Sequence, residues 1–289
     1  MADSWHLGVI GGSGLAAGLA LDGAQVIEVA SPFGLPSAAV TTGTLAGVRL
    51  TFLPRHGSGH AIPPGAVNYR ANIDVLKRCG VTDVIALCAI GSLSSAIAPG
   101  HFVAADQFID RTSGRANSFF GPGLVAHVNL ADPVCARLRG GLVSAAEGEE
   151  LQIHAAGCYV AIEGPQFSTR AESRLYQSWG GDVIGMTAMP EARLAREAEL
   201  PYALLGMVTD YDSWRADDAG VEAGDVLAVM QRNLAAARRV IERLVGSLPH
   251  TRSPSHIDTA LDGAIMTAPA ARDPVLAAKL QAVAGRVLA

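Results

Sequence analysis

The sequence is poor in cysteine, and its cysteines do not cluster. Four occur in 289 residues, without a C-x-x-C pair or a histidine at metal-ligand spacing: Cys79, Cys88, Cys135 and Cys158. The eight histidines are equally dispersed, and no H-E-x-x-H pattern is present. Zinc sites and disulfide frameworks both need such clusters. We therefore expect free thiols and no metal site.

Long hydrophobic runs and blocks of like charge are missing too. Apolar runs such as 84–90 and 203–208 are far shorter than the roughly 20 residues of a membrane helix. The N-terminus lacks the basic and apolar regions of a secretory signal. The net charge of −5 argues against the concentrated basic face that nucleic-acid binding requires. We expect a cytoplasmic protein that binds neither membranes nor nucleic acid.

Hydrophobic residues, in contrast, make up 49% of the chain, which is enough for a large buried core. The length would allow two domains, but single α/β domains reach this size, and we prefer one compact domain. Short apolar runs rich in β-branched residues predict strands at 6–10, 39–42, 50–53, 81–87, 102–105, 159–162, 183–186 and 202–209. Helical patterns lie between several of them, at 70–79, 170–179, 188–199 and 224–245. This alternation predicts an α/β fold.

The near-continuous apolar run VTDVIALCAIGS is typical of a sheet that is covered on both faces. In open α/β sheets, ligands bind beyond the carboxyl ends of the strands. The residues that follow each apolar run are therefore the candidates for function.

Residues 246–289 differ in character from residues 1–245. The segment 246–256, GSLPHTRSPSH, is rich in Ser, Pro and His, which predicts an exposed excursion. Residues 274–288 carry an apolar helical face that can dock on the body or on a neighbouring subunit. We expect residues 246–289 to be an extension of the same domain.

The segment GVIGGSGL, residues 8–15, is a strand that runs into a glycine-rich turn. Its backbone N–H groups and the Ser13 hydroxyl could receive a phosphate. A simple chain reversal is an equally good interpretation. A dinucleotide site is disfavoured, because Glu28, the next acidic strand residue, follows Gly14 by only 14 positions.

A second group of polar residues, 53–72, follows another predicted strand. Arg55 supplies a planar fork for an oxyanion, and His56 and His60 stand beside it. A solvated loop end is the alternative. The density of His, Arg, Asn and Tyr in this one loop favours an anion site.

A third group, residues 162–191, combines a strand end with a helix start. Phe167 could stack on a flat base, although a core position is the commoner fate of a lone phenylalanine. Met186 and Thr187 end another strand, which places the Thr187 hydroxyl to donate to an anion.

The fourth group is VTDYDSW, in which Asp210 and Asp212 leave an apolar strand two residues apart. If the strand conformation persisted, both side chains would lie on one face. Two acids on one edge can hold the N6 amine and N7 of adenine, and a carboxyl near N7 can share a proton with a leaving base. A solvated loop with capping aspartates is the alternative.

Together, these blocks and their order resemble the methylthioadenosine phosphorylase and purine nucleoside phosphorylase family. The resemblance extends through PFGLPSA, PRHG, NYRAN, DQFIDRTSGR, EGPQFSTRAES, GMTAMPEARLARE and TDYDSW, and covers nearly everything before about residue 245. It implies a single-domain phosphorylase/hydrolase-like fold with a central mixed, twisted sheet flanked by helices. It also implies a homotrimer, or a hexamer built as a dimer of trimers, that uses phosphate as co-substrate and needs no metal or organic cofactor.

The resemblance carries the family's roles onto matching positions of this sequence. The phosphate-binding positions are matched by Ser13, Arg55, His56, Thr187 and the backbone of Ala89. The ribose and base positions are matched by Met186, Phe167, Ser168, Asp210 and Asp212, with the two acids as catalytic residues. The 5′ pocket is matched by Val226, Leu227 and, reaching across a subunit boundary, His127.

These matches imply phosphate-dependent cleavage of the N-glycosidic bond of a 5′-modified adenosine, with methylthioadenosine as the leading substrate. The Asp pair favours a 6-amino purine, because a carboxylate facing O6 of a 6-oxopurine is a buried mismatch of about 1–3 kcal/mol. Asp210 should share its proton with N7, for which it needs a raised pKa. Cys88, Gly185 and Ala223 depart from the family pattern, so a 5′-halogenated adenosine stays open. The rivals are a phosphorylase for inosine, guanosine or methylthioinosine, a nucleosidase, a nucleoside-binding protein and a dehydrogenase.

Overall fold

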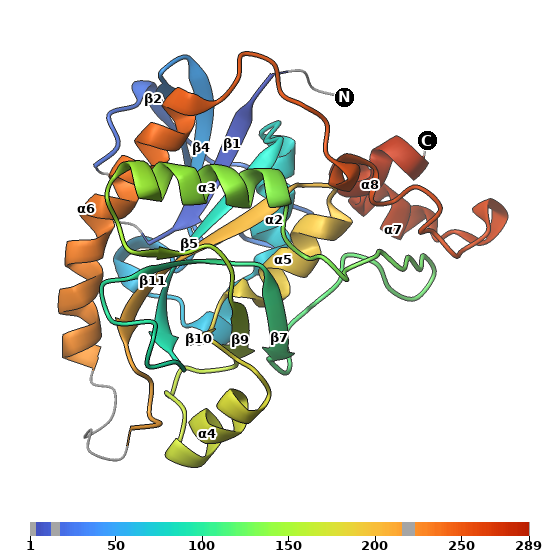
Figure 1. Cartoon of the computed structure of the whole chain (residues 1–289). Helices are drawn as coiled ribbons and strands as arrows, with labels where there is room; N and C mark the ends of the chain where they lie inside the picture. Colours follow the sequence, from blue (N-terminus) through green and yellow to red (C-terminus); the bar gives the residue numbers. More distant parts are fainter. Residues whose placement is uncertain (1–3, 13–17, 216–222, 289) are drawn as a thin grey trace.

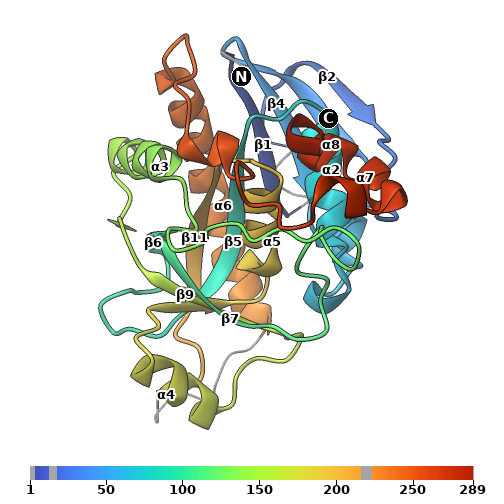
Figure 2. The ribbon, with the colours of Figure 1, turned by 90° about the vertical axis from the view of Figure 1, so that its right-hand side faces the viewer.

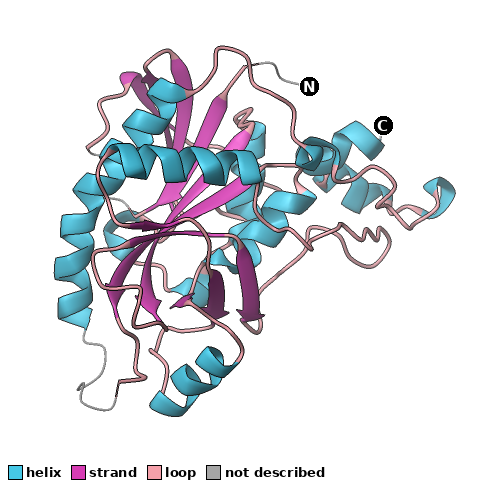
Figure 3. Ribbon diagram, viewed as in Figure 1, coloured by secondary structure: helices cyan, strands magenta, loops and turns pink. Residues whose placement is uncertain are grey.

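The computed structural model describes residues 4–12, 18–215 and 223–288 of the chain. In this part, one mixed sheet of eleven strands runs through the molecule (Figure 3). Its main path is β2-β3-β4-β1-β5-β10-β9-β7, and β11, β6 and β8 branch from β5. The strands are β1 (His6–Gly11), β2 (Asp22–Ile27), β3 (Val40–Leu45), β4 (Val48–Pro54), β5 (Asp83–Ser92), β6 (Phe102–Ala105), β7 (Gln107–Arg111), β8 (Ile153–His154), β9 (Cys158–Ile162), β10 (Val183–Gly185) and β11 (Tyr202–Asp210). The predicted α/β fold with a central mixed sheet is confirmed.

Helices cover both faces of this sheet (Figures 1 and 2). One face packs against α3 (Ala136–Gly148) and α6 (Ala223–Ser247). The other packs against α2 (Tyr69–Arg78), α5 (Ala188–Glu197) and α8 (Gln281–Leu288), with α7 (Pro274–Lys279) beside α8. A further helix, α4 (Arg170–Ser178), lies at the lower edge of the molecule in Figure 1. No described helix is both long and apolar enough to pass through a membrane.

Strand β5 shows why the apolar run is continuous. Its even-numbered residues Val84, Ala86 and Cys88 enter the core on the α2/α5 side, whereas Ile85 and Leu87 enter the core on the α3/α6 side. Successive side chains of a strand point to opposite faces, so a strand that is buried on both faces must be apolar at every position. The predicted cover on both faces of the sheet is confirmed.

Strand β5 is also where the sheet divides. Its first half pairs in parallel with β1, whereas Gly91 and Ser92 pair antiparallel with β10. β11 pairs in parallel with β5 from Val84 to Gly91. The register of β11 shifts between Val208 and Asp210, beside this change of partner. The ends of β5, β10 and β11 therefore meet at one point of the sheet.

The eight predicted strands and four predicted helices of the body are all present, with ends that shift by a few residues. The strands β2, β7 and β8 and the helix α3 were not predicted. The single helix predicted at 274–288 is instead two helices that break at Leu280. The segment 246–256 is mostly exposed, but Arg252 within it is buried and anchors it to the body.

Candidate active site

Arg55 stands directly after β4, at the carboxyl edge of the parallel strands, and its side chain is only 2% exposed. Its Nε and Nη2 donate to the Glu191 carboxylate at 2.7 and 2.9 Å, and its Nη1 donates to the Leu87 carbonyl at 3.1 Å. These bonds use three of the five guanidinium N–H groups. The fork is thus held rigidly, with capacity left for an oxyanion.

Glu191 was not predicted as a functional residue, although it stands in the quoted block GMTAMPEARLARE. It is 1% exposed and also accepts a hydrogen bond from the Tyr202 hydroxyl at 3.0 Å. A carboxylate at such a buried site is tolerated because it is both paired and hydrogen-bonded. Its charge compensates the cation of Arg55 before any ligand arrives.

Thr187 lies at the start of α5 and meets β5 through Cys88. The Thr187 Oγ1 is 3.3 Å from the Cys88 Sγ, and the Thr187 N–H points to the Tyr159 hydroxyl at 3.4 Å. Burial raises the pKa of the Cys88 thiol, although the neighbouring Arg55 acts in the opposite direction. Cys88 is therefore a neutral, weak donor beside the predicted anion site.

The glycine at position 185, which departs from the family pattern, has a local explanation. A Cβ at this position would lie 2.0 Å from the Tyr159 hydroxyl oxygen. Tyr159 is fully buried and comes from the neighbouring strand β9. Its ring fills the space that any side chain at position 185 would need.

His56 lies beside Arg55 as a neutral imidazole. Its Nδ1 is 2.8 Å from the Ile62 carbonyl, which can only accept, so Nδ1 carries the proton and Nε2 is the acceptor of the neutral ring. Burial, with the charge of Arg55 as the second cause, lowers the pKa of His56 to about 4. The His60 ring stacks on it with centroids 4.2 Å apart. The anion site thus carries no net excess of positive charge when empty.

Asp210 and Asp212 lie together, but not for the predicted reason. β11 ends at Asp210, and Asp212 has a positive φ of 49°, so the strand conformation does not persist. Instead, the Asp212 N–H donates to Asp210 Oδ1 at 2.8 Å, and the Thr209 hydroxyl donates to Asp210 Oδ2 at 2.7 Å. The assumption of a continuing strand was wrong, and a tight turn brings the pair together.

Asp212 is buried, and the Ser173 hydroxyl of α4 donates to its Oδ2. Burial raises the pKa of Asp212, and the nearby charge of Asp210 adds to this, while the bond from Ser173 opposes it. Ser168, which is 8% exposed, lies beside Asp212, and its hydroxyl also lowers the pKa of that carboxyl. This end of the site therefore offers one buried acid with a raised pKa and two hydroxyl groups beside it.

Phe167 is 42% exposed, so it is not the core residue that the alternative interpretation supposed. The helix that follows it starts with a capping box, in which the Thr169 hydroxyl accepts from the Glu172 N–H and the Glu172 carboxylate accepts from the Thr169 N–H at 2.7 Å. This cap fixes the chain directly after Phe167 and Ser168. The stacking role of Phe167 stays a prediction.

Four predicted site residues are not brought into this cluster by the described contacts. Ser13 lies outside the described residues, and so do the side chains of Val226 and Leu227 on α6. His127 lies on an exposed loop, and its N–H donates to the Ala264 carbonyl of the C-terminal segment at 2.9 Å. A partner for its side chain within the predicted site of its own chain is not among these contacts.

Strand β5 joins the two halves of the site. Arg55 touches it at Leu87, Thr187 touches it at Cys88, and the Asp210 carboxylate lies over Gly91, where a Cβ would be only 2.8 Å from Asp210 Oδ1. Four residues of strand span about 13 Å, and the half-buried Ala89 lies between the two ends. The predicted anion-binding half and the predicted proton-sharing half therefore face one continuous stretch of backbone.

Such a fold and site define an α/β protein whose buried, paired polar side chains gather at the carboxyl ends of its central strands. The family model described as the Phosphorylase superfamily matches residues 6–246, and the chain belongs to this superfamily.

Relatives match over nearly the whole chain. An S-methyl-5′-thioadenosine phosphorylase from Bradyrhizobium diazoefficiens is 53% identical over 284 residues, which cover 98% of each protein. Among solved structures, a methylthioadenosine phosphorylase from an antarctic soil metagenomic library superposes with a TM-score of 0.90 at 40% identity, covering 97% of this chain and 99% of that one. A methylthioadenosine phosphorylase from Schistosoma mansoni in complex with tubercidin gives a TM-score of 0.77 at 38% identity, covering 84% and 91%.

Proposed function

We propose that this enzyme cleaves the N-glycosidic bond of 5′-methylthioadenosine with inorganic phosphate, giving adenine and 5-methylthioribose 1-phosphate. The observation that carries the proposal is the placement of Arg55 and the Asp210/Asp212 pair along five residues of β5. The names of the relatives at 53% and 40% identity agree with it. The reaction needs phosphate as a co-substrate and no metal or organic cofactor.

In the proposed mechanism, Arg55, His56 and Thr187, together with Ser13 and the backbone of Ala89, hold phosphate beneath C1′ of the ribose. The C1′–N9 bond breaks while the bond from a phosphate oxygen to C1′ forms. Holding the anion there replaces a bimolecular encounter by a local one, and its charge stabilises the cationic sugar. The proton that hydrogen phosphate loses balances the one that adenine gains.

The acids act on the leaving base. Asp210 shares a proton with N7, so that adenine does not leave as an anion. Asp212 is buried with a raised pKa, and Ser173 and the turn to Asp210 fix its position. A protonated carboxyl can donate to a ring nitrogen, and an ionised one can accept from the N6 amine. The pair thus matches the donor and acceptor pattern of a 6-aminopurine.

The decisive assay follows adenine release from methylthioadenosine with and without phosphate. Release that proceeds equally well without phosphate would make the protein a nucleosidase. A panel of methylthioadenosine, methylthioinosine, inosine and a 5′-halogenated 5′-deoxyadenosine tests the base and the 5′ group separately. We expect the 6-amino substrates to be preferred, with methylthioadenosine first. The neutral thiol of Cys88 and the ring of Tyr159 shape this site differently from the family pattern, and the panel reports on that difference.

We also propose that the chain assembles as a trimer, or as a hexamer of two trimers, in which His127 of one subunit approaches the 5′ group in the next. The loop that carries His127 is joined to the C-terminal segment by the bridge between Ala126 and Ile265. Apolar side chains on this arm are exposed, namely Val125, Met266 and Val275. Light scattering after gel filtration gives the subunit number. A monomeric, fully active enzyme would refute the role of His127. A role of the enzyme in purine and methionine salvage and its location in the cytoplasm stay predictions.

A further inference from the structure

Arg115 has no role in the mechanism described so far, yet it is the most heavily bonded side chain near the site. It stands in the loop after β7, and its side chain is only 2% exposed. Fully buried arginines are rare unless each N–H group finds a partner. Its partners therefore indicate what it does.

All five N–H groups of Arg115 are used. Its Nη1 donates to the carbonyls of Met186 and Met189 at 2.7 and 2.8 Å, with the Tyr69 hydroxyl oxygen also at 3.1 Å. Its Nη2 donates to the carbonyls of Ile162 and Glu163 at 3.4 and 2.7 Å, and its Nε faces the Glu163 carboxylate at 3.1 and 3.2 Å. The guanidinium thus binds the main chain of two separate segments, 162–163 and 186–189.

Both segments carry groups of the site. The turn 186–189 includes Thr187 of the anion half and is irregular, since Met189 has φ −117° and ψ 136° inside α5. Carbonyls that such an irregular segment does not pair within the helix need partners from elsewhere. The segment 162–163 leads through Gly164 to Phe167 and Ser168 of the base half. The two segments also touch, because a Cβ on Gly164 would lie 2.4 Å from the Met186 Sδ.

We propose that Arg115 is a positioning residue that sets the distance between the phosphate-binding turn and the base-binding loop. It touches neither ligand and acts only through the main chain that it holds. The inference rests on the proposed phosphorolysis, because that reaction requires the two halves of the site to be aligned. A misplacement of about 1 Å can lower the rate of a well-aligned reaction by roughly 100-fold.

Lysine separates geometry from charge at this position. Arg115→Lys keeps the cation opposite Glu163, but its three N–H groups start from one nitrogen and cannot reach both segments as a planar fork does. A loss that the lysine variant does not repair therefore reports on the fork and not on the positive charge.

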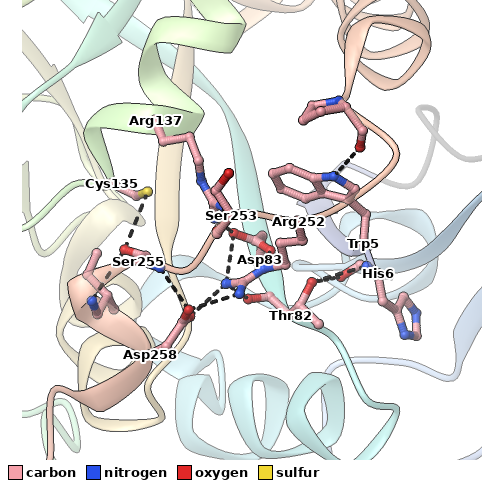
Figure 4. A network of polar contacts seen from close by, with 12 residues as sticks. Trp5, His6, Thr82, Asp83, Cys135, Arg137, Arg252, Ser253, Ser255 and Asp258 are labelled. Carbon is pink, nitrogen blue, oxygen red and sulfur yellow. Dashed lines mark hydrogen bonds and ion pairs between the residues drawn. The ribbon is translucent and has the colours of Figure 1, made fainter. Parts of the chain in front are cut away.

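The chain offers a matched control in Arg252, which is 3% exposed and equally well bonded (Figure 4). Its guanidinium binds the carboxylates of Asp83 and Asp258, and Arg137 also reaches Asp83. Asp83 opens β5 at the end of the strand opposite to the site. Arg252→Lys therefore disturbs a buried arginine cluster of similar kind without touching either loop.

The experiment compares wild type, Arg115→Lys and Arg252→Lys by thermal unfolding and by kcat and KM for phosphate and methylthioadenosine. We expect both variants to lower the Tm. Only Arg115→Lys should lower kcat/KM for both substrates, by about tenfold or more. Equal kcat and KM values for both variants and wild type would overturn the inference. An inactive wild type would instead refute the proposed function.

If Arg115→Lys does not fold, Glu163→Gln takes its place. This variant keeps every main-chain carbonyl that Arg115 binds. It weakens the ionic hold on Nε and the bond that the Ser113 N–H donates to the carboxylate, so the fold is retained more easily. It should raise the KM for both substrates together, which a purely structural role would not do once the folded fraction is corrected for. Unchanged KM values in this folded variant would likewise overturn the inference.

Discussion

Removing the charge of Glu191 should make the protein less stable and, at the same time, more dependent on phosphate. Glu191 and Arg55 form a buried, two-bond ion pair with side chains 1% and 2% exposed. Glu191→Gln keeps the shape and one acceptor oxygen, but it leaves the guanidinium without a counter-charge. A buried cation in that state is the costly outcome, whereas the pair itself contributes little.

The size of the effect follows from this burial. Breaking a buried pair by removing one partner costs about 3–5 kcal/mol, and solvent screening is small at these exposures. Phosphate bound at Arg55 would return a negative charge to the guanidinium. The variant should therefore recover more stability from phosphate than the wild type does, by the usual linkage of ligand binding to folding.

The assay is chemical unfolding at several phosphate concentrations. Chloride is added so that the ionic strength stays constant. Asp83→Asn serves as the control, because it breaks the pair between Asp83 and the buried Arg252 far from the site. Both variants should lose stability without phosphate, and only Glu191→Gln should regain a large share of it with phosphate. An equal response of the two variants to phosphate would refute the assignment of Arg55 as the anion-binding group.

Four further predictions address the other groups. Asp210→Asn should lower kcat for methylthioadenosine by about 100-fold or more, since an amide cannot share the N7 proton. The unfolding midpoint should stay close to that of wild type. Unchanged turnover in steady-state kinetics would contradict this prediction. His56, with its pKa lowered to about 4, should take up a proton when phosphate binds near pH 5.5. Calorimetry in buffers of different ionisation enthalpy should detect this proton in wild type and not in His56→Gln. Unfolding of the phosphate-free protein should become easier as the pH falls from about 6.5 towards 4, because His6 and His56 have folded-state pKa values of about 4 and bind more protons when unfolded. Gly185→Ala should lower the stability in urea unfolding by about 1–3 kcal/mol, and Tyr159→Phe in the same chain should recover part of it; simple additivity would argue against the contact.

The sheet could be predicted from the sequence wherever burial leaves a pattern. β5 and β11 alternate between two cores and are apolar except at their ends. β2, with the sequence DGAQVI, is exposed at every position and pairs only along one edge, so it has no apolar period. The helix α3 contains the pair Gly140-Gly141, which lowers its helical signal.

The residues of the candidate site, too, could be predicted only where they leave a pattern in the sequence. Arg55 and Asp210 could be predicted because each follows an apolar strand at its carboxyl end. Glu191 and Arg115 could not, because a charged residue in a helix or a loop is usually a solvated one. Their proposed roles depend on partners that lie 136 residues away for Glu191 and 46 to 74 residues away for Arg115. Composition and spacing contain no signal for such pairs.

In the proposed reaction, the charges of the site would favour the transition state over the bound substrates. Before phosphate binds, Arg55 is compensated by Glu191, and His56 and Cys88 are neutral. The incoming phosphate therefore brings negative charge that the protein compensates only in part. In the proposed reaction, the missing positive charge develops on the ribose as the C1′–N9 bond breaks. An interaction that is strongest at that moment lowers the barrier, whereas a cation that fully neutralised phosphate would stabilise the ground state equally.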